Sequence, residues 1–234
     1  MTEEFFMLRD EEKFFGRIRD LISVKDKSVL DVGGAGEEAV FAHKMKEWGA
    51  DVTVLDNSER RLKLCSIRGM LADASSIPLP DRSFDVVSAF LMLHEVPPSL
   101  HPKVLGEMKR VGKMIVILER RPSVPSSPDE EKLRERWDKL ADSVGEIEKP
   151  QPKDHWLSML GDMNVRSYDF IFVYGEDNEE KSDEDRIKSM MKTRGYPEHL
   201  LRECFAQARV VEQQRKEEGK RLEDSLYLII GKQV

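Results

Sequence analysis

Asp31 and the glycines that follow it are the first residues whose types and spacing could form a binding site. Asp31 lies near the end of a short apolar run, Ser28–Val32, that is typical of a buried strand, and glycines follow at positions 33, 34 and 36. A glycine-rich turn lets the backbone approach a ligand closely and opens the N-terminus of a helix. A carboxylate here can receive a cationic α-amino group, whereas it would repel a pyrophosphate. The alternative is a plain strand–turn–helix with a capping aspartate.

Two further aspartates occupy the ends of the next two predicted strands. Asp56 follows the β-branched run Asp51–Leu55, and an acid about 20 residues after a glycine turn is placed to bind both ribose hydroxyls. Asp73 ends a shorter predicted strand, Met70–Asp73. Taken singly, Asp56 could cap the next helix and Asp73 could be a turn residue. Together, three carboxylates at the ends of successive strands suit a ligand that is cationic at one end and carries a ribose.

The elements that position these acids alternate between strand and helix through about residue 120. Two more strands are predicted at Phe84–Phe90 and Met114–Leu118, and the connecting helices at 37–48, 59–67 and 99–111. Such alternation gives parallel strands joined by crossover helices, with ligands at the carboxyl ends of the strands.

The two ends of the chain are read from the same periodicities. Residues 3–22 have roughly helical apolar spacing and predict one or two amphipathic helices. The second half predicts helices at 130–144 and 153–160, strands at 165–174 and 226–230, and a charged helical segment, 186–223, interrupted at 195–197. The region from about 175 to 223 is read as an insertion between the last two strands.

Composition narrows the class of protein. The 234 residues include 35% charged and 39% hydrophobic residues and have a formal net charge of −7, so binding to a polyanion such as nucleic acid is disfavoured. Two cysteines, Cys65 and Cys204, match no metal-ligand or disulfide spacing, and we expect no metal site. No apolar run is long enough to span a membrane and no signal pattern opens the chain. A cytoplasmic location is expected.

Four segments in this order resemble the class I S-adenosylmethionine-dependent methyltransferases, in particular the branch that contains ubiquinone and menaquinone biosynthesis methyltransferases. The matching stretches, which cover about residues 26 to 120, are 29–36 (VLDVGGAG), 52–58 (VTVLDNS), 72–74 with 77–87 (ADA and IPLPDRSFDVV) and 105–116 (LGEMKRVGKMIV). The resemblance implies a Rossmann-like, doubly wound α/β fold: a mostly parallel seven-stranded sheet with helices on both faces and an antiparallel last strand.

The resemblance also implies a domain organisation. We expect a single methyltransferase domain over 1–234, with an N-terminal helical lid at 1–25, a cofactor-binding half at 26–120 and an acceptor-side half at 121–234 that contains the 175–223 insertion.

By the same resemblance, individual residues take roles around S-adenosylmethionine and its product S-adenosylhomocysteine. The glycine turn and Asp31 would border the methionine portion, Asp56 would hold the ribose and Asn57 would lie beside the adenine. Asp73 would accept from the adenine amino group, with the backbone of Ala74 at a ring nitrogen. The set expected to bind the cofactor comprises Asp31, Gly33, Gly34, Gly36, Asp56, Asn57, Asp73, Ala74, Ala89 and Phe90.

The turn departs from the family pattern in one respect. The family usually has glycines at alternate positions after the acid, whereas this chain reads Gly33-Gly34-Ala35-Gly36-Glu37. Either one residue is missing or Ala35 and Glu37 replace two glycines. Glu37 at the third glycine position would crowd the ligand.

His94 is the best candidate for a catalytic base, because it follows the fourth predicted strand where the family often has histidine. A packing or helix-start role is the alternative. A base is needed only if the acceptor holds a proton that it will not lose unaided. Glu119, at the end of the fifth strand, could face the acceptor or the solvent.

Two other functions share part of this pattern. An NAD(P)-binding oxidoreductase would use the loose glycine fingerprint at 34–39 and Asp56, but Asp31 and the Asp73 segment count against it. A non-catalytic methyltransferase-like subunit is suggested by the altered turn and the charged insertion. The expected acceptor is a small molecule, a homodimer is compatible with the sequence, and no residue set identifies the methylated atom.

Overall fold

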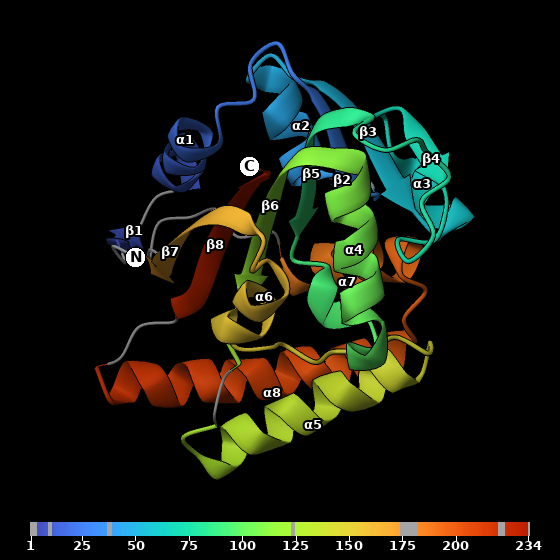
Figure 1. The fold of residues 1–234 in the computed structure, drawn as a ribbon. Coiled ribbons are helices and arrows are strands. Elements are labelled where there is room, and N and C mark those ends of the chain that lie inside the picture. Colours follow the sequence, from blue (N-terminus) through green and yellow to red (C-terminus); the bar gives the residue numbers. More distant parts are fainter. Residues whose placement is uncertain are drawn as a thin grey trace.

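A single mixed sheet forms the centre of the structure, a computed structural model that describes residues 4–8, 11–36, 39–122, 125–173, 182–219 and 223–233. The strand order is β1-β7-β8-β6-β5-β2-β3-β4 (Figure 1). The strands are β1 (Glu4–Leu8), β2 (Ser28–Val32), β3 (Asp51–Asp56), β4 (Gly69–Leu71), β5 (Phe84–Phe90), β6 (Gly112–Arg120), β7 (Met163–Val173) and β8 (Glu223–Gln233).

The predicted Rossmann-like fold class is confirmed, and β1 adds an eighth strand to the seven that were predicted. Strands β4, β3, β2, β5 and β6 are parallel to one another, and the last strand, β8, pairs antiparallel with both β6 and β7. Each predicted strand after residue 25 is present, although β7 and β8 are longer than the periodicity indicated. The parallel central strands bring their carboxyl ends to one edge of the sheet, where ligands of doubly wound folds bind.

The N-terminal segment corrects one expectation. Residues 4–8 form β1 and not a helix, because they pair in parallel with the outer edge of β7, from Glu4 opposite Tyr168 to Leu8 opposite Phe172. An unpaired strand edge offers a row of backbone donors and acceptors, and helical periodicity within the segment cannot reveal that distant partner. The amphipathic helix that follows, α1 (Glu11–Ile22), is as predicted.

Helices cover both faces of the sheet (Figure 1). On one face, α1 and α2 (Val40–Glu47) bury a core that includes Ile18, Met45, Val54 and Val86. On the other face lie α4 (His101–Val111) and α6 (Lys153–Met159), whose core includes Leu105 and Trp156. Shorter connecting elements are α3 (Glu59–Leu64), η1 (Leu93–Glu95) and η2 (Pro98–Leu100). Two packed layers hold the strand ends rigidly in place.

Three further helices form what we call the helical cap: α5 (Pro128–Asp142), α7 (Asp183–Thr193) and α8 (Glu198–Glu217). Figure 1 shows α5 and α8 side by side across the end of the molecule toward which the arrows of β5 and β6 point. A separate apolar cluster joins them, with Leu140, Ile187, Leu201 and Phe205 at its centre. The predicted break in the insertion is present at 195–197, whereas residues 174–181 and 220–222 lie outside the described residues.

None of the helices in the described part of the chain is both long and apolar enough to cross a lipid bilayer.

The cap cluster makes a stability prediction. Leu201 is fully buried in it, so Leu201→Ala should lower the free energy of unfolding by about 2–5 kcal/mol through lost burial and an unfilled cavity. Amide exchange in α5 and α8 should accelerate more than exchange in β2 and β5. Val210→Ala, an exposed site on the same helix, is the control and should change stability by less than about 0.5 kcal/mol. Equal effects of the two substitutions would contradict the packing described for the cap.

Candidate active site

Asp31 is a buried carboxylate with one satisfied and one unsatisfied oxygen. The side chain is 1% exposed, and Ser88 Oγ donates a hydrogen bond of 2.8 Å to Oδ1. Oδ2 is buried without a hydrogen-bond partner among the described residues. Burial raises the pKa of Asp31 to about 7, with the Ser88 hydroxyl opposing the shift and the charge of Asp56 adding to it. An unpaired buried carboxylate of this kind is costly, which is the signature of a site that receives a cation.

The turn after Asp31 passes close to this buried oxygen. A Cβ added at Gly34 would lie 2.0 Å from Asp31 Oδ2, so any larger residue would cover the carboxylate. Gly33 has a φ of +74°, and a Cβ there would lie 2.0 Å from the Met92 side chain. Glycine is therefore required at both positions. Gly36 is also placed in the turn, while Glu37, which we expected to crowd the ligand, lies outside the described residues.

Asp56 ends the neighbouring strand and is 3% exposed. Its Oδ1 accepts a 2.9 Å hydrogen bond from the backbone N–H of Ser58, while Oδ2 has no hydrogen-bond partner among the described residues. Burial raises the pKa of Asp56, and the charge of Arg61 opposes that shift. Ser58, and not Asp56, caps α3, because the Ser58 side chain accepts from the backbone N–H of Arg61. Asp56 makes a turn bond to Ser58 instead, and its Oδ2 lies at the strand end, 3.7 Å from Arg61 Nε.

Arg61 connects these acids to the next loop. Its Nε donates to the carbonyl of Ala35 at 3.0 Å and lies 3.7 Å from Asp56 Oδ2. Its Nη2 donates to the Gly33 carbonyl at 3.4 Å, and its Nη1 lies 3.7 Å from Glu95 Oε2. The guanidinium therefore holds the glycine turn to the strand that carries Asp56.

The helical cap joins the same network from the other side. Arg194, directly after α7, donates from Nη2 to Glu95 Oε1 at 2.5 Å and from Nη1 to Glu146 Oε2 at 2.9 Å. Arg60, on α3, donates to the carbonyls of Lys192 and Met191 at the end of α7. The cap is thus bound by charged side chains to the loops that carry the site.

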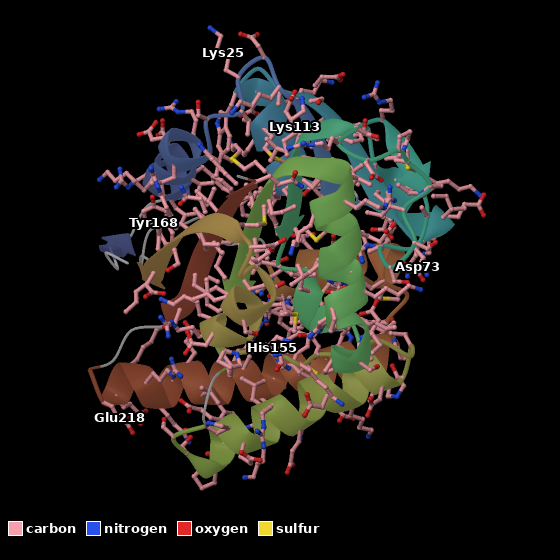
Figure 2. All side chains as sticks on the ribbon, viewed as in Figure 1. Lys25, Asp73, Lys113, His155, Tyr168 and Glu218 are labelled. Atoms are coloured by element: carbon pink, nitrogen blue, oxygen red, sulfur yellow. The ribbon has the colours of Figure 1, made fainter. Side chains whose placement is uncertain are left out.

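The residues predicted to bind an adenine lie on the outer side of this arrangement. Asp73 is exposed, its Oδ1 accepts from the backbone N–H of Ser75 at 2.7 Å, and these bonds lower its pKa. Figure 2 shows Asp73 on the side of the molecule that carries β4, away from Tyr168 on β7. Asn57 is exposed and Ala74 half-buried. No hydrogen bond among the described residues joins these three to Asp31.

Ala89 and Phe90 end β5 but point to opposite faces. Ala89 is fully buried in the core under α4, so only its backbone can contribute to a site. Phe90 lies on the face that carries Asp31 and stacks on Phe41, the two rings 4.1 Å apart at 11°. The Phe90 ring therefore packs beside the start of α2, next to the glycine turn.

His94 is held by a buried carboxylate. It lies in η1 with 1% of its surface exposed, and its Nδ1 is 2.7 Å from Glu119 Oε2. The other oxygen of Glu119 accepts the backbone N–H groups of Met92 and Leu93, at 2.8 and 2.6 Å. Glu119 is 1% exposed, so its side chain points into the protein and does not face the solvent.

Sequence reasoning missed four residues that belong to this region: Ser88, Arg61, Glu95 and Glu148. Ser88 had a local signal, because it is the one hydroxyl in the otherwise apolar stretch 86–90 and shares its strand face with Phe90. Arg61, Glu95 and Glu148 had none, since each gains its role from residues far away in the chain.

Comparisons with known proteins agree with this arrangement. Residues 30–115 match the family model described as a methyltransferase domain. The YcgJ protein from Bacillus subtilis has a similar structure, with a TM-score of 0.60 and 15% identity over 95% of this chain and 99% of that one. A SAM-dependent methyltransferase from Archaeoglobus fulgidus is similar with a TM-score of 0.55 and 19% identity, over 96% of this chain and 95% of its own. No curated protein matches the sequence.

The matched segment, 30–115, holds the glycine turn, the three aspartates and η1, and the structural likeness extends over most of the chain. Residues 30–115 are therefore similar to a methyltransferase domain, and the chain as a whole has a Rossmann-like fold.

Proposed function

We propose that this protein binds S-adenosylmethionine at the carboxyl ends of β2 and β3 and transfers its methyl group to a small-molecule acceptor. The observation that carries the proposal is the unpaired Oδ2 of Asp31, which is buried beside a turn that only glycine can form. A carboxylate left in this state favours a ligand that brings a positive charge, such as the α-ammonium of the cofactor's methionine portion.

The second free oxygen supports the same ligand. Asp56 Oδ2 has no hydrogen-bond donor among the described residues and lies on the strand next to Asp31. A ribose hydroxyl is the neutral donor that suits it. A dinucleotide would share the ribose, but its pyrophosphate would be repelled by Asp31, so the pair of acids favours the methyl donor over NAD(P).

The remaining predicted contacts keep the roles that the family resemblance implies. Asn57, Asp73 and Ala74 would approach the adenine, and the backbone of Ala89 with the ring of Phe90 would border the methionine portion. Asp73 lies on an exposed loop with its Oδ1 already in a turn, so this is the contact for which the geometry gives least support.

When bound, S-adenosylmethionine supplies a methyl group already activated on a sulfonium centre. The work left to the protein is to hold the acceptor in line and to exclude water. The helical cap lies across the carboxyl ends of the strands (Figure 1) and is tied to η1 through Arg194 and Glu95. An acceptor enclosed between the cap and the sheet would be small, and the net charge of −7 disfavours nucleic acid.

A direct binding measurement tests the proposal. Titration calorimetry with S-adenosylhomocysteine should give one site per chain, whereas NAD⁺ and NADP⁺ should give no heat of binding. Labelled methyl transfer from S-adenosylmethionine to a metabolite extract then separates an enzyme from a non-catalytic binding subunit. Absence of binding at millimolar S-adenosylhomocysteine would refute the proposal.

The raised pKa of Asp31 predicts a pH dependence of binding. With a pKa near 7 in the free protein, Asp31 loses its charge as the pH falls, and the ligand ammonium loses its partner. The association constant for S-adenosylhomocysteine should fall about tenfold from pH 8 to pH 6. In Asp31→Asn, binding should be weak and nearly flat over that range. A wild-type affinity that is constant over this range would contradict the role of Asp31.

The same carboxylate predicts a trade-off between binding and stability. The folded-state pKa of Asp31 is raised above the usual 3.8, so the folded state loses stability as the pH rises from about 4 to 7. Asp31→Asn removes this pH-dependent loss of stability, and the amide oxygen can still accept the hydrogen bond from Ser88 Oγ. We expect it to raise the free energy of unfolding by about 1–3 kcal/mol at pH 8, after the cost of an unpaired amide, and by almost nothing at pH 4.

Denaturant unfolding of both proteins at the two pH values provides the measurement. Ser88→Ala is the matched control, because it removes the donor to Asp31 while leaving the buried charge in place, and it should lower stability at pH 8. A destabilised Asp31→Asn at pH 8 would mean that the carboxylate is an ordinary structural group.

A further inference from the structure

Three side chains at the junction of η1 and the loop after α5 form a cluster that the methyl-transfer proposal does not use. His94, Glu95 and Glu148 each offer one ligand atom, and these atoms lie within 4.8 Å of one another. His94 is buried and the two glutamates are half-buried. An imidazole and two carboxylates converging on one point are a ligand set that divalent cations use in proteins.

The environment of His94 fixes which ring nitrogen carries a proton. Glu119 accepts two backbone N–H groups through Oε1, which holds the whole carboxylate in place. A carboxylate beside the ring can only accept, so His94 Nδ1 donates to Glu119 Oε2 across 2.7 Å. In the neutral imidazole, Nε2 is then left with a lone pair, and this nitrogen is the one that faces the cluster.

The atom opposite Nε2 is also electron-rich. Glu148 Oε2 lies 3.6 Å from His94 Nε2. A lone pair facing a carboxylate oxygen requires a positive species between them, either a proton or a metal ion. A shared proton would draw the two atoms to about 2.7–2.9 Å. Two ligands of one tetrahedral zinc ion, each about 2.0–2.2 Å from the metal, lie about 3.4 Å apart. The 3.6 Å separation of this pair is close to that distance, and the three ligand atoms of the cluster lie within 4.8 Å of one another.

The second shell around the cluster is in place. The Glu119–His94 pair has the carboxylate–histidine arrangement that orients a ligand imidazole toward a metal. Glu95 Oε1 accepts from Arg194 at 2.5 Å, and its Oε2 lies 3.7 Å from Arg61 Nη1. Both oxygens of Glu95 therefore face guanidinium groups, and a cation bound at the cluster would share Glu95 with them.

Glu148 has no hydrogen-bond donor within the part of the chain that the structure describes. A half-buried carboxylate without a direct donor is costly in the same way as Asp31. Arg194 and Arg61 bind the neighbouring Glu95, at 2.5 and 3.7 Å.

We propose that His94 Nε2, Glu95 and Glu148 bind a divalent first-row cation of the zinc type. Three protein ligands leave at least one coordination position for water or for an oxygen of the acceptor. Because Glu95 is joined through Arg61 to the glycine turn, the ion would lie on the acceptor side of the cofactor site. This last step, in which the ion orients or acidifies an acceptor hydroxyl, rests on the proposed function; the cation site itself does not.

The test uses the full chain, freed of metal with a chelator and then dialysed. Calorimetric titration with Zn²⁺ should show one site in the micromolar range or tighter, and Co²⁺ should give the visible absorption of a tetrahedral centre. Mg²⁺ should bind far more weakly, because it prefers an octahedral oxygen shell. Glu148→Gln should weaken Zn²⁺ binding at least tenfold.

Glu146→Gln is the matched control, since it removes the same charge from the same loop and Glu146 pairs instead with Arg194 and Tyr196. It should change the Zn²⁺ affinity by less than about threefold. Equal weakening by both variants would mean that cations are attracted diffusely to an acidic surface. Absence of Zn²⁺ binding to the folded protein would mean that a proton, and not a metal ion, lies between His94 Nε2 and Glu148 Oε2. Either result overturns the site.

Titration with S-adenosylhomocysteine distinguishes a failure of the cation proposal from a failure of the proposed function. S-adenosylhomocysteine titrated into chelated protein reports on Asp31 and Asp56 alone, so its binding without any Zn²⁺ site refutes only the cation proposal. Zn²⁺ binding without S-adenosylhomocysteine binding would refute only the proposed function.

Discussion

The carboxylate of Asp31 is buried with one oxygen unpaired, and the geometry around it follows from that condition. Gly34 lets the turn pass close to that oxygen, and Gly33 adopts a left-handed conformation in which a Cβ would meet Met92. Ser88 satisfies the other oxygen from the adjacent strand. Nothing in the core would be lost if this group were neutral, since the carboxylate costs stability. The ligand that we propose would supply the missing charge.

A chain of alternating charges extends from this turn to the helical cap. Each residue contacts the next in the order Asp56, Arg61, Glu95, Arg194 and Glu146, and the charged atoms of successive residues are 3.7, 3.7, 2.5 and 2.9 Å apart. Each acid is shared by the groups on both sides of it, so the position of the cap depends on the same side chains that border the cofactor turn. Partly buried ion pairs contribute little net stability. Here these ion pairs fix the position of the helical cap relative to the ends of the strands.

The sequence was sufficient for features that depend on local pattern. The apolar runs ending at Val32 and Asp56 specify buried parallel strands, and the topology then brings Asp31 and Asp56 to one edge. Residues 4–8 were mispredicted because their strand state comes from β7, about 160 residues away in the chain. The same limit applies to Arg61 and Glu148, whose partners are set by the packing of loops and not by any periodicity. Local signals thus gave the cofactor side of the site and left the acceptor side undetermined.

His94 shows why residue type and strand position alone could not decide a role. After a parallel strand, a histidine can be a base, a ligand or a packing residue, and the sequence is the same in each case. The distinction comes from Glu119, which lies on the neighbouring strand and is held by two backbone N–H groups. With Nδ1 committed to Glu119, only Nε2 can act, and Nε2 faces Glu148 across a gap too long for a hydrogen bond. A base would need that nitrogen directed at the acceptor, whereas a ligand needs it directed at other ligands, and the nearby Glu148 is what supports the ligand role that we propose.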